Sequence, residues 1–397
     1  MALLNMSCGQ TSLHPRVLEA MGTQVKGPIY YPAYWNLEIE TIALLRQLMH
    51  TQNDVLLIAG SATYGLEAAL CTLVEPEEKI LVVNSGKYGQ VMADLAEIVG
   101  GTAINLEALE GKAVGIQSIR QVLLENPDIA LIAAVHCDTS TGIMTPIDEI
   151  GQMLAYEFPD KLFLVDAVAS LAGTALHVDD WHIDVAFTSP QKCLNGPQGL
   201  AIVSVSQRAW ESIAQRNSPT TSLCLDLTVW REYHAGLARA HATERWIDVS
   251  TSTRKAVHGP SPSYTLVAGL HAALEAFFAE GPERVFARHD LASQAVRVGV
   301  RATGLKVYAD EAVASPVSTR IVFDQPVDWT EIMSRMLNAH GIFLASGFRI
   351  GTMGESANPD SVLITLEKLQ HTLSELGYPV KSGIEEARLA LLTHKSP

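Results

Sequence analysis

Short apolar segments alternate with longer amphipathic ones through the first half of the chain, and this alternation constrains the fold more than any other feature. Asp54 to Gly60 ("DVLLIAG") is one such segment, and the helix-length "SATYGLEAALCTLV" follows it directly. Five more apolar segments continue the series: "KILVVNSG", "IALIAAVH", "KLFLVDAV", "DVAFTSP" and "GLAIVSV". Strands with two apolar faces, separated by helices, are typical of a mainly parallel sheet covered on both sides. We therefore predict an α/β domain in which ligands bind beyond the carboxyl ends of the strands.

The pattern changes near Ser261. A long helical region begins there and is interrupted at Gly281-Pro282, and the rest of the chain mixes helical stretches with the strand-like "SPVSTRIVFD" and "IFLASGFRIGTMG". This mixture of helical and strand-like segments predicts a smaller C-terminal α+β domain. We expect an N-terminal arm at residues 1–15, a large domain at 16–258 and a small domain at 259–397.

Charge and cysteine content exclude several classes of function. Lys and Arg total 28 against 43 Asp and Glu, a formal net charge of −15, which argues against nucleic-acid and anionic-membrane partners. The start of the chain has no basic segment before a long apolar run, and no uninterrupted apolar stretch reaches 18 residues, so we expect neither a secretion signal nor a membrane span. The cysteines have no metal-type spacing, and their odd number favours reduced thiols in the cytoplasm: Cys8, Cys71, Cys137, Cys193 and Cys224.

Three strand ends carry residues that could bind a ligand. Ser61 ends one strand and opens a helix, where backbone amides attract an anion; an ordinary serine N-cap is the alternative. Asp166 emerges from "LFLV" and needs a partner if it is buried; a helix cap or a salt bridge is the alternative. Lys192 follows the next strand, and its alternative is an ordinary surface lysine.

Two further strand ends are less specific. Tyr88, in "NSGKYGQ", is either a surface aromatic or a platform on which a ring could stack. His136 begins the polar loop "HCDTSTG", and we interpret it as structural because no second His or Cys has zinc-type spacing. We expect no metal site.

Taken together, these groups predict a pyridoxal phosphate site. The helix N-terminus would hold the phosphate, the aromatic residue would stack on the ring, and Asp166 would keep the pyridine nitrogen protonated. Lys192 would supply the amine that bonds to the cofactor's aldehyde and would then move the substrate's α-proton.

The chain resembles the class V aminotransferases of fold type I, in the serine/alanine–glyoxylate group, and it looks most like pyridoxamine–pyruvate aminotransferase. The resemblance runs from about Ser7 to Leu391 and rests on "GSATYGLEAAL", "VDAVAS", "SPQKCLNGPQGL", "EGPERVFARHDL" and "FRIGTMG". It implies a large domain with a mainly parallel seven-stranded sheet, a smaller C-terminal α+β domain and a homodimer.

The resemblance also implies a role for individual residues. Lys192 and Asp166 are the expected catalytic residues, Arg349 is expected to bind the substrate carboxylate, and Gly9 belongs to a loop that lines the substrate site. The remaining cofactor contacts are expected to be a ring platform, a residue on the opposite ring face, a phenolic-oxygen contact and a phosphate cradle; these are Tyr88, Val168, Thr139, Ser61, Ala62, Thr63 and Gln191. In this family the partner subunit completes the phosphate pocket, and "HGPSPSY" occupies that segment here.

Departures from the family pattern refine the expectation. Pyridoxamine–pyruvate aminotransferase has a glutamate where this chain has Ser61, so we favour bound pyridoxal phosphate over free pyridoxamine. It also has a second arginine in a longer loop before "RIG", whereas the short loop here contains only Arg349, enough for one carboxylate. Relatives usually have proline at Gln10, and aromatic or threonine residues at Gly259 and Pro260.

We therefore expect a ping-pong, Schiff-base transamination from a small amino donor to pyruvate or glyoxylate. Pyridoxamine–pyruvate transfer, 2-aminoethylphosphonate transamination, suggested by "SLCLDL" and "FRIGTMGE", and β-elimination on the same scaffold remain open. Cysteine desulfuration needs a mobile thiolate late in the chain, and no cysteine follows Cys224. A non-catalytic ligand sensor is disfavoured because Lys192, Asp166 and Arg349 are all present.

Overall fold

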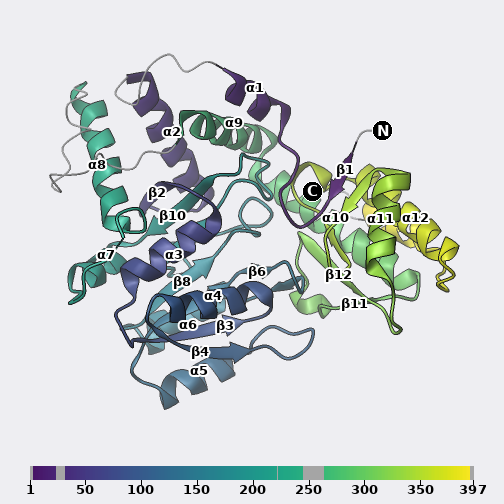
Figure 1. Ribbon diagram of the computed structural model, residues 1–397, viewed down its shortest axis with the longest axis horizontal. Helices are drawn as coiled ribbons and strands as arrows, with labels where there is room; N and C mark the ends of the chain where they lie inside the picture. Colours follow the sequence, from purple (N-terminus) through teal and green to yellow (C-terminus); the bar gives the residue numbers. More distant parts are fainter. Residues whose placement is uncertain (1–2, 24–31, 221, 245–262, 394–397) are drawn as a thin grey trace.

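The computed structural model describes residues 3–23, 32–220, 222–244 and 263–393. It has a larger half built around one sheet and a smaller C-terminal half beside it (Figure 1). The expected α/β fold, with a large sheet domain and a smaller α+β part, is confirmed. The helices of the described residues include none that combines the length and the apolar character needed to span a membrane.

The central sheet has seven strands in the order β2-β10-β9-β8-β5-β3-β4. Only β10 runs antiparallel to its neighbours, so the sheet is mainly parallel, as predicted. The strands are β2 Asp54–Ala59, β3 Lys79–Asn84, β4 Thr102–Glu107, β5 Ile129–Val135, β8 Leu162–Asp166, β9 Val185–Thr188 and β10 Leu200–Val205.

Both faces of the sheet are buried because successive side chains of each strand enter opposite cores. In β2, for example, Val55 and Leu57 pack on one face while Leu56 and Ile58 pack on the other. The first face is covered mainly by α1 Pro15–Gly22, α2 Pro32–Leu48, α5 Ile116–Glu125, α6 Ile147–Glu157 and α9 Tyr264–Glu280. The second is covered by α3 Ala62–Leu73, α4 Lys87–Ile98, α7 Gln207–Ala214 and α8 Leu227–Thr243.

One strand of the sheet has no counterpart among the six apolar segments that the sequence singled out. β4 lies at the edge and reads "TAINLE", and none of its six residues is buried: each is either exposed or partly buried. Because helices bury β4 on neither face as they do β2 at the opposite edge, its sequence lacks the continuous apolar run that marks the other strands.

The smaller half packs helices against a three-stranded sheet of order β11-β12-β14. The sheet consists of β11 Lys306–Val307, β12 Ser318–Val322 and β14 Arg349–Gly351, and a further strand, β13 Ile342–Leu344, lies outside it. The helices are α10 Pro282–Ala302, α11 Trp329–His340, α12 Pro359–Glu375 and α13 Ile384–Thr393. Two short 3-10 helices, η2 Glu311–Val313 and η3 Gly354–Ser356, and a two-stranded hairpin, β6 Cys137–Asp138 with β7 Ile143–Met144, complete the structure.

The N-terminal arm joins the two halves. Its strand β1 Leu4–Met6 pairs in parallel with β13 of the smaller half, and the chain then crosses to α1 on the larger half (Figure 1). The crossing residues are fastened to the loop after β9: the amide of Thr11 donates to the Gln191 carbonyl at 2.9 Å. The arm therefore lies against the segment that carries Lys192.

The expected division between residues 258 and 259 falls outside the described residues. The first helix after it, α9, contributes Val267, Leu270 and Leu274 to the same core as α1 and α2, whereas α10 packs into the core of the smaller half. We therefore propose that the structural break lies at Gly281, between α9 and α10, and that α9 is part of the large domain.

Candidate active site

A cavity of about 250 Å³ lies at the carboxyl edge of the large sheet. The parallel strands β2, β3, β5, β8 and β9 all end at this edge, so the loops that follow them meet there. All nine residues predicted to bind a cofactor line this one cavity: Ser61, Ala62, Thr63, Tyr88, Thr139, Asp166, Val168, Gln191 and Lys192. Its wall is completed by Leu66, Val91, Cys137, Ala169, Phe187 and Gln198.

The first helix after β2 points its N-terminus at the cavity. Ser61 occupies the N-cap position of α3 with an extended backbone, yet its hydroxyl makes no capping hydrogen bond. The amides of Ala62 and Thr63 belong to the first turn and have no acceptor within the helix. The chain before Ser61 passes so close to the Tyr64 side chain that only glycine fits at position 60, because a Cβ there would lie 2.7 Å from Cγ of Tyr64. The serine is therefore not acting as a cap, and the turn is free to bind an anion.

Tyr88 is held at the cavity by a carboxylate that the sequence did not single out. Asp138 Oδ2 accepts from the amide of Tyr88 at 2.8 Å, and Asp138 Oδ1 accepts from the amide and the hydroxyl of Ser140 at 2.8 and 2.5 Å. Gly86 precedes the helix, and a Cβ there would lie 2.7 Å from the Asp138 carboxyl carbon. Asp138 thus fixes the start of α4 and, with it, the position of the tyrosine ring.

Asp166 ends β8 and is buried, with 8% of its surface exposed. Burial raises the pKa of this carboxyl from its ordinary value of 3.8 to about 7, although the amide of Val168, which donates to Oδ1 at 2.8 Å, opposes the shift. Among the described residues, no cation forms an ion pair with Asp166, so the alternative of a structural salt bridge finds no support. A buried carboxyl that lines a cavity without a cationic partner is a candidate partner for a positively charged ligand atom.

Lys192 lies in the same cavity with 9% of its surface exposed, so it is not a surface lysine. Its Nζ donates to the carbonyl oxygen of Cys8 in the N-terminal arm. Burial lowers the pKa of the lysine, and the nearby Arg349 adds to this effect while Asp166 opposes it. A lowered pKa increases the fraction of neutral amine, which is the nucleophilic form.

Two polar atoms in the cavity wall have no partner within the protein. Thr139 Oγ1 and Gln191 Oε1 are buried and make no hydrogen bond. Buried polar atoms are almost always hydrogen-bonded, so atoms without a partner at a cavity wall indicate a polar ligand. The site therefore offers a hydroxyl, an amide oxygen, an anion-binding helix end and a buried carboxyl to one ligand.

Arg349 and Gly9 adjoin the cavity but do not line it. Arg349 lies on β14, where its Nη1 donates to the Thr139 carbonyl at 3.1 Å and its Nε to the Ser346 carbonyl at 2.8 Å. Gly9 follows Cys8, whose carbonyl accepts from Lys192. Next to it, Gln10 donates to Gln198, which does line the cavity, so the arm forms part of its rim.

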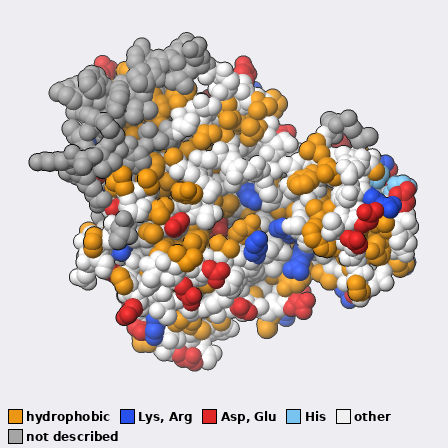
Figure 2. Space-filling view, in the orientation of Figure 1, with side chains coloured by type: hydrophobic (Ala, Val, Ile, Leu, Met, Phe, Trp, Pro, Cys, Tyr) orange, Lys and Arg blue, Asp and Glu red, His pale blue; other side chains and the backbone are white. Residues whose placement is uncertain are grey.

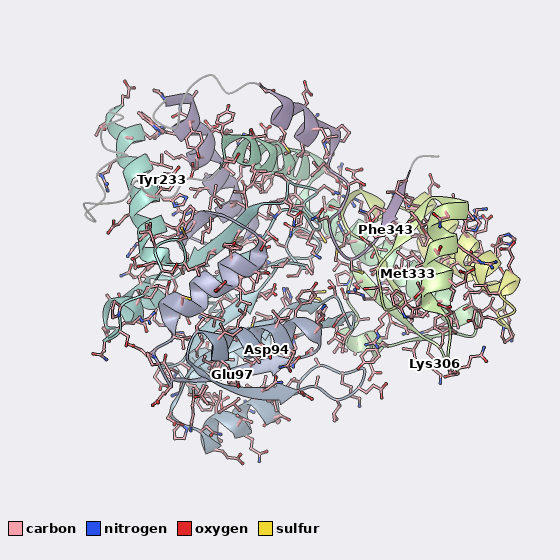
Figure 3. All side chains as sticks on the ribbon, viewed as in Figure 1. Asp94, Glu97, Tyr233, Lys306, Met333 and Phe343 are labelled. Carbon is pink, nitrogen blue, oxygen red and sulfur yellow. The ribbon has the colours of Figure 1, made fainter. Side chains whose placement is uncertain are left out.

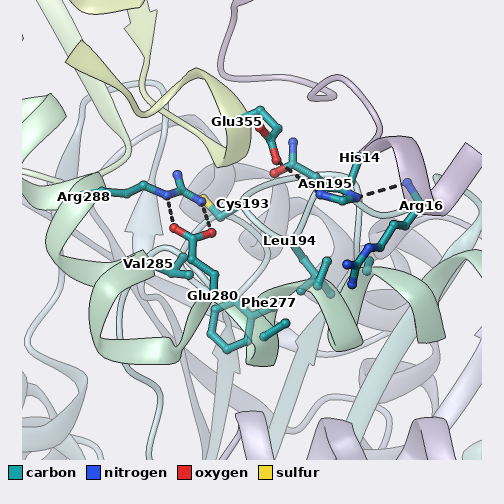
Figure 4. A pocket seen from close by; sticks show the side chains of 13 residues that line it. His14, Arg16, Cys193, Leu194, Asn195, Phe277, Glu280, Val285, Arg288 and Glu355 are labelled. Carbon is teal, nitrogen blue, oxygen red and sulfur yellow. Dashed lines mark hydrogen bonds and ion pairs between the residues drawn. The ribbon is translucent and has the colours of Figure 1, made fainter.

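The reverse side of the Lys192 loop faces a second cavity, of about 330 Å³ (Figure 4). Arg288 crosses it and pairs with Glu280 at 2.5 Å, while its Nη1 donates to the Gly354 carbonyl at 2.6 Å. Gly354 has φ +56°, and a Cβ there would lie 2.0 Å from the amide oxygen of Asn195. This close packing fixes the "RIGTMG" segment, which runs from β14 into η3, against the loop that carries Lys192.

No metal site is present among the described residues: no group of three or more His, Cys, Asp or Glu side chains is placed to hold an ion. His136, at the end of β5, packs edge-on against Trp181, and burial lowers its pKa to about 4. The residue is therefore neutral and part of the packed interior.

The α/β fold, with a helix end, a buried carboxyl and a lysine at one sheet edge, is the arrangement expected of an aminotransferase that uses pyridoxal phosphate. Comparison with known proteins gives the family. The chain belongs to the class-V aminotransferases, whose family model matches residues 39–356.

Relatives in this family cover nearly the whole chain. An uncharacterised aminotransferase of Methanocaldococcus jannaschii is 33% identical over 98% of this chain and 97% of its own length. The crystal structure of ureidoglycine–glyoxylate aminotransferase from Bacillus subtilis superposes with a TM-score of 0.87 at 31% identity, covering 98% of each chain. Pyridoxamine–pyruvate aminotransferase from Mesorhizobium loti superposes with a TM-score of 0.88 at 29% identity, covering 99% of this chain and 97% of its own. The protein is accordingly an enzyme that transfers amino groups.

Proposed function

We propose that this aminotransferase binds pyridoxal 5'-phosphate in the 250 Å³ cavity and transfers an amino group from a small amino donor to pyruvate or glyoxylate by a ping-pong mechanism. The observation that carries the proposal is the meeting of a buried carboxyl with a raised pKa and a buried lysine with a lowered one in a single cavity. Paired perturbations of this kind are typical of catalytic groups.

The residues fit the cofactor at each of its functional groups. Ser61 and the amides of Ala62 and Thr63 would hold the phosphate, together with the side-chain Nε2–H groups of Gln191, which lines the cavity. Tyr88 and Val168 would contact the two faces of the ring. The unpartnered hydroxyl of Thr139 would bind the phenolic oxygen.

The catalytic work is divided among three side chains. When bound, pyridoxal phosphate supplies an aldehyde that condenses with amines and a ring that accepts the electrons of the broken α C–H bond. Asp166 would hold a proton at the ring nitrogen, where a cation returns the pKa of the buried carboxyl toward its ordinary range. The amine of Lys192 would move the proton between the substrate's α-carbon and the neighbouring cofactor carbon. Arg349 would bind the substrate carboxylate through its planar guanidinium.

Two observations support the choice of cofactor and acceptor. Ser61 puts no charge beside the helix end, which suits a phosphorylated cofactor. The related enzymes from Bacillus and Mesorhizobium are named for glyoxylate and pyruvate, both short 2-oxo acids with a single carboxylate. We propose the same class of acceptor here.

A homodimer and a cytoplasmic location are parts of the same proposal. The segment "HGPSPSY", which the resemblance places in the partner's phosphate pocket, includes residues 258–262, and these lie outside the described residues. Gly259 and Pro260 are among them. The five cysteines are all free thiols, and three are buried, which supports a reducing compartment.

A donor and acceptor screen tests the proposed function. Purified protein loaded with pyridoxal phosphate is mixed with one amine at a time while the cofactor's absorption is followed. We expect an amine donor to bleach the aldehyde form and pyruvate or glyoxylate to restore it. Release of ammonia without recovery by any 2-oxo acid would point to β-elimination and contradict the proposal.

A further inference from the structure

A second arginine lies beside Arg349 in the sheet of the smaller half. β12 and β14 pair antiparallel, and their register places Arg320 directly opposite Arg349. On the other side of β12, the amide of Tyr308 donates to the Arg320 carbonyl at 2.9 Å. The three residues therefore form one row across the three strands, with their side chains on one face of the sheet.

That face is turned toward the cavity. The intervening positions, Ile321 and Ile350, pack into the core of the smaller half. Ser318, two residues before Arg320 and on the same face, donates to the Thr139 carbonyl at 3.1 Å. Arg349 donates to the same carbonyl at 3.1 Å. Because Thr139 lines the cavity, Arg349 borders the place where a substrate would lie, and Arg320 lies beside Arg349 on the same face of the sheet.

Within the part of the chain that the structure describes, neither arginine has a carboxylate to offset its charge. Like charges directly opposite each other in an antiparallel pair are destabilising. Among the described residues, no carboxylate pairs with either guanidinium. The Arg320 guanidinium instead rests on the ring of Tyr308, 4.5 Å from its centroid, which orients it without using its N–H groups as donors.

The distribution of charged side chains on the surface also favours an anionic substrate. The chain as a whole carries a net charge of −15, yet Lys and Arg side chains gather at the waist between the two halves (Figure 2). A local positive field in an acidic protein concentrates anions at that point. The charge distribution is therefore suited to a substrate with more than one negative group.

We propose that Arg320 binds a second anionic group of the amino donor while Arg349 binds its α-carboxylate, so that the preferred donor is an amino acid with a distal carboxylate, phosphonate or phosphate. The inference rests on the proposed function, and it extends the sequence-based expectation of one arginine for one carboxylate. That expectation came from the short loop before Arg349, whereas the second cation comes from the neighbouring strand. Pyruvate or glyoxylate, with one carboxylate, needs only Arg349.

The first test compares variants of the pyridoxal phosphate-loaded enzyme. Arg320→Gln keeps the length of the side chain and removes its charge. Lys306→Gln is the matched control, because it removes one charge from the adjacent strand at a residue that pairs with Asp324 at the outer edge of the smaller half (Figure 3). KM and kcat are measured with L-alanine and with three donors that carry a second anion: L-aspartate, L-glutamate and O-phospho-L-serine.

We expect Arg320→Gln to raise KM by about tenfold or more for the best doubly anionic donor and to leave KM for L-alanine within about twofold. Lys306→Gln should leave both unchanged. Preference for a carboxylate or for a phosphate among the three donors identifies the second group. Equal effects of Arg320→Gln on alanine and on the doubly anionic donors would overturn the inference.

A second measurement does not depend on turnover of a doubly anionic donor. With L-alanine as donor, the better inhibitor of succinate and 3-phosphonopropionate should inhibit the wild-type enzyme at a concentration at least about tenfold lower than propionate, and Arg320→Gln should remove that difference. If neither dianion inhibits better than propionate, Arg320 does not bind a distal anion. An enzyme that transaminates alanine but shows no such preference refutes only this inference, whereas one that transaminates no amine refutes the proposed function.

Discussion

Replacing Asp166 with asparagine tests whether the buried carboxyl of this residue serves to bind a ligand or to stabilise the fold. The residue is buried, has no cationic partner among the described residues and has a pKa of about 7 instead of 3.8. A carboxyl whose pKa is higher in the folded than in the unfolded state destabilises the fold as the pH rises between those two values. In protein stripped of bound cofactor, Asp166→Asn should therefore be more stable than the wild type at neutral and alkaline pH.

The size of the effect follows from the pKa difference. A difference of about three pH units, at about 1.4 kcal/mol each, corresponds to about 4 kcal/mol once Asp166 is fully ionised. A little over a third of this destabilisation is already present at pH 5, because the unfolded carboxyl has ionised by then and the folded one has not. The advantage of the asparagine variant should consequently grow by about 3 kcal/mol between pH 5 and pH 8.

Urea unfolding at the two pH values, followed by tryptophan fluorescence, measures this difference. Asp94→Asn is the control, since Asp94 is an exposed residue of α4 (Figure 3), and it should show no comparable change between the two pH values. The same Asp166→Asn substitution should lower transaminase activity by several orders of magnitude. An asparagine variant that is less stable than the wild type at both pH values would refute the reasoning, because it would show that the carboxylate stabilises the fold.

Further predictions concern four other sites. Lys192→Ala should abolish turnover with an unchanged circular dichroism spectrum; retained activity would contradict the mechanism. Ser61→Glu should weaken pyridoxal phosphate binding about tenfold or more in equilibrium dialysis, whereas Ser61→Ala should have a smaller effect, because only the glutamate repels the phosphate. Asp138→Ala should cost about 1–3 kcal/mol in urea unfolding, since it leaves the amide of Tyr88 without its acceptor; no loss would argue against its role in fixing α4. Gly354→Ala should lower the melting temperature by several degrees because its Cβ would collide with Asn195, whereas Gly347→Ala, which has a similar positive φ in open space, should lower it less; equal losses would mean that backbone conformation alone matters.

The sequence predicted the parts of the fold and site that depend on parallel strands. Central strands are buried on both faces, so β5 and β8 stand out as continuous apolar runs. Their carboxyl ends meet at one edge of the sheet, which is why residues as distant in sequence as Ser61, Asp166 and Lys192 were expected together and do line one cavity. The edge strand β4 was missed because it is only partly buried.

Residues whose role depends on tertiary contacts were not predictable in the same way. Asp138 sits in the loop "HCDTSTG" and matters because it reaches the amide of Tyr88, fifty residues earlier in the chain. Arg320 is an ordinary strand residue in the sequence, and only the β12–β14 register brings it opposite Arg349. The polar side chain of Asp138 at a strand end was a weak signal for the first; the sequence contains no comparable signal for the second.

The central claim is that the ε-amino group of Lys192 bonds to pyridoxal phosphate, and borohydride tests it most directly. Reduction of the loaded enzyme fixes the cofactor on whichever amine carries it, and digestion followed by mass spectrometry identifies the peptide. The account predicts a single modified residue, Lys192, in the peptide that contains "SPQKCLNGPQGL". Modification of a different lysine, or none at all in fully loaded protein, would contradict it.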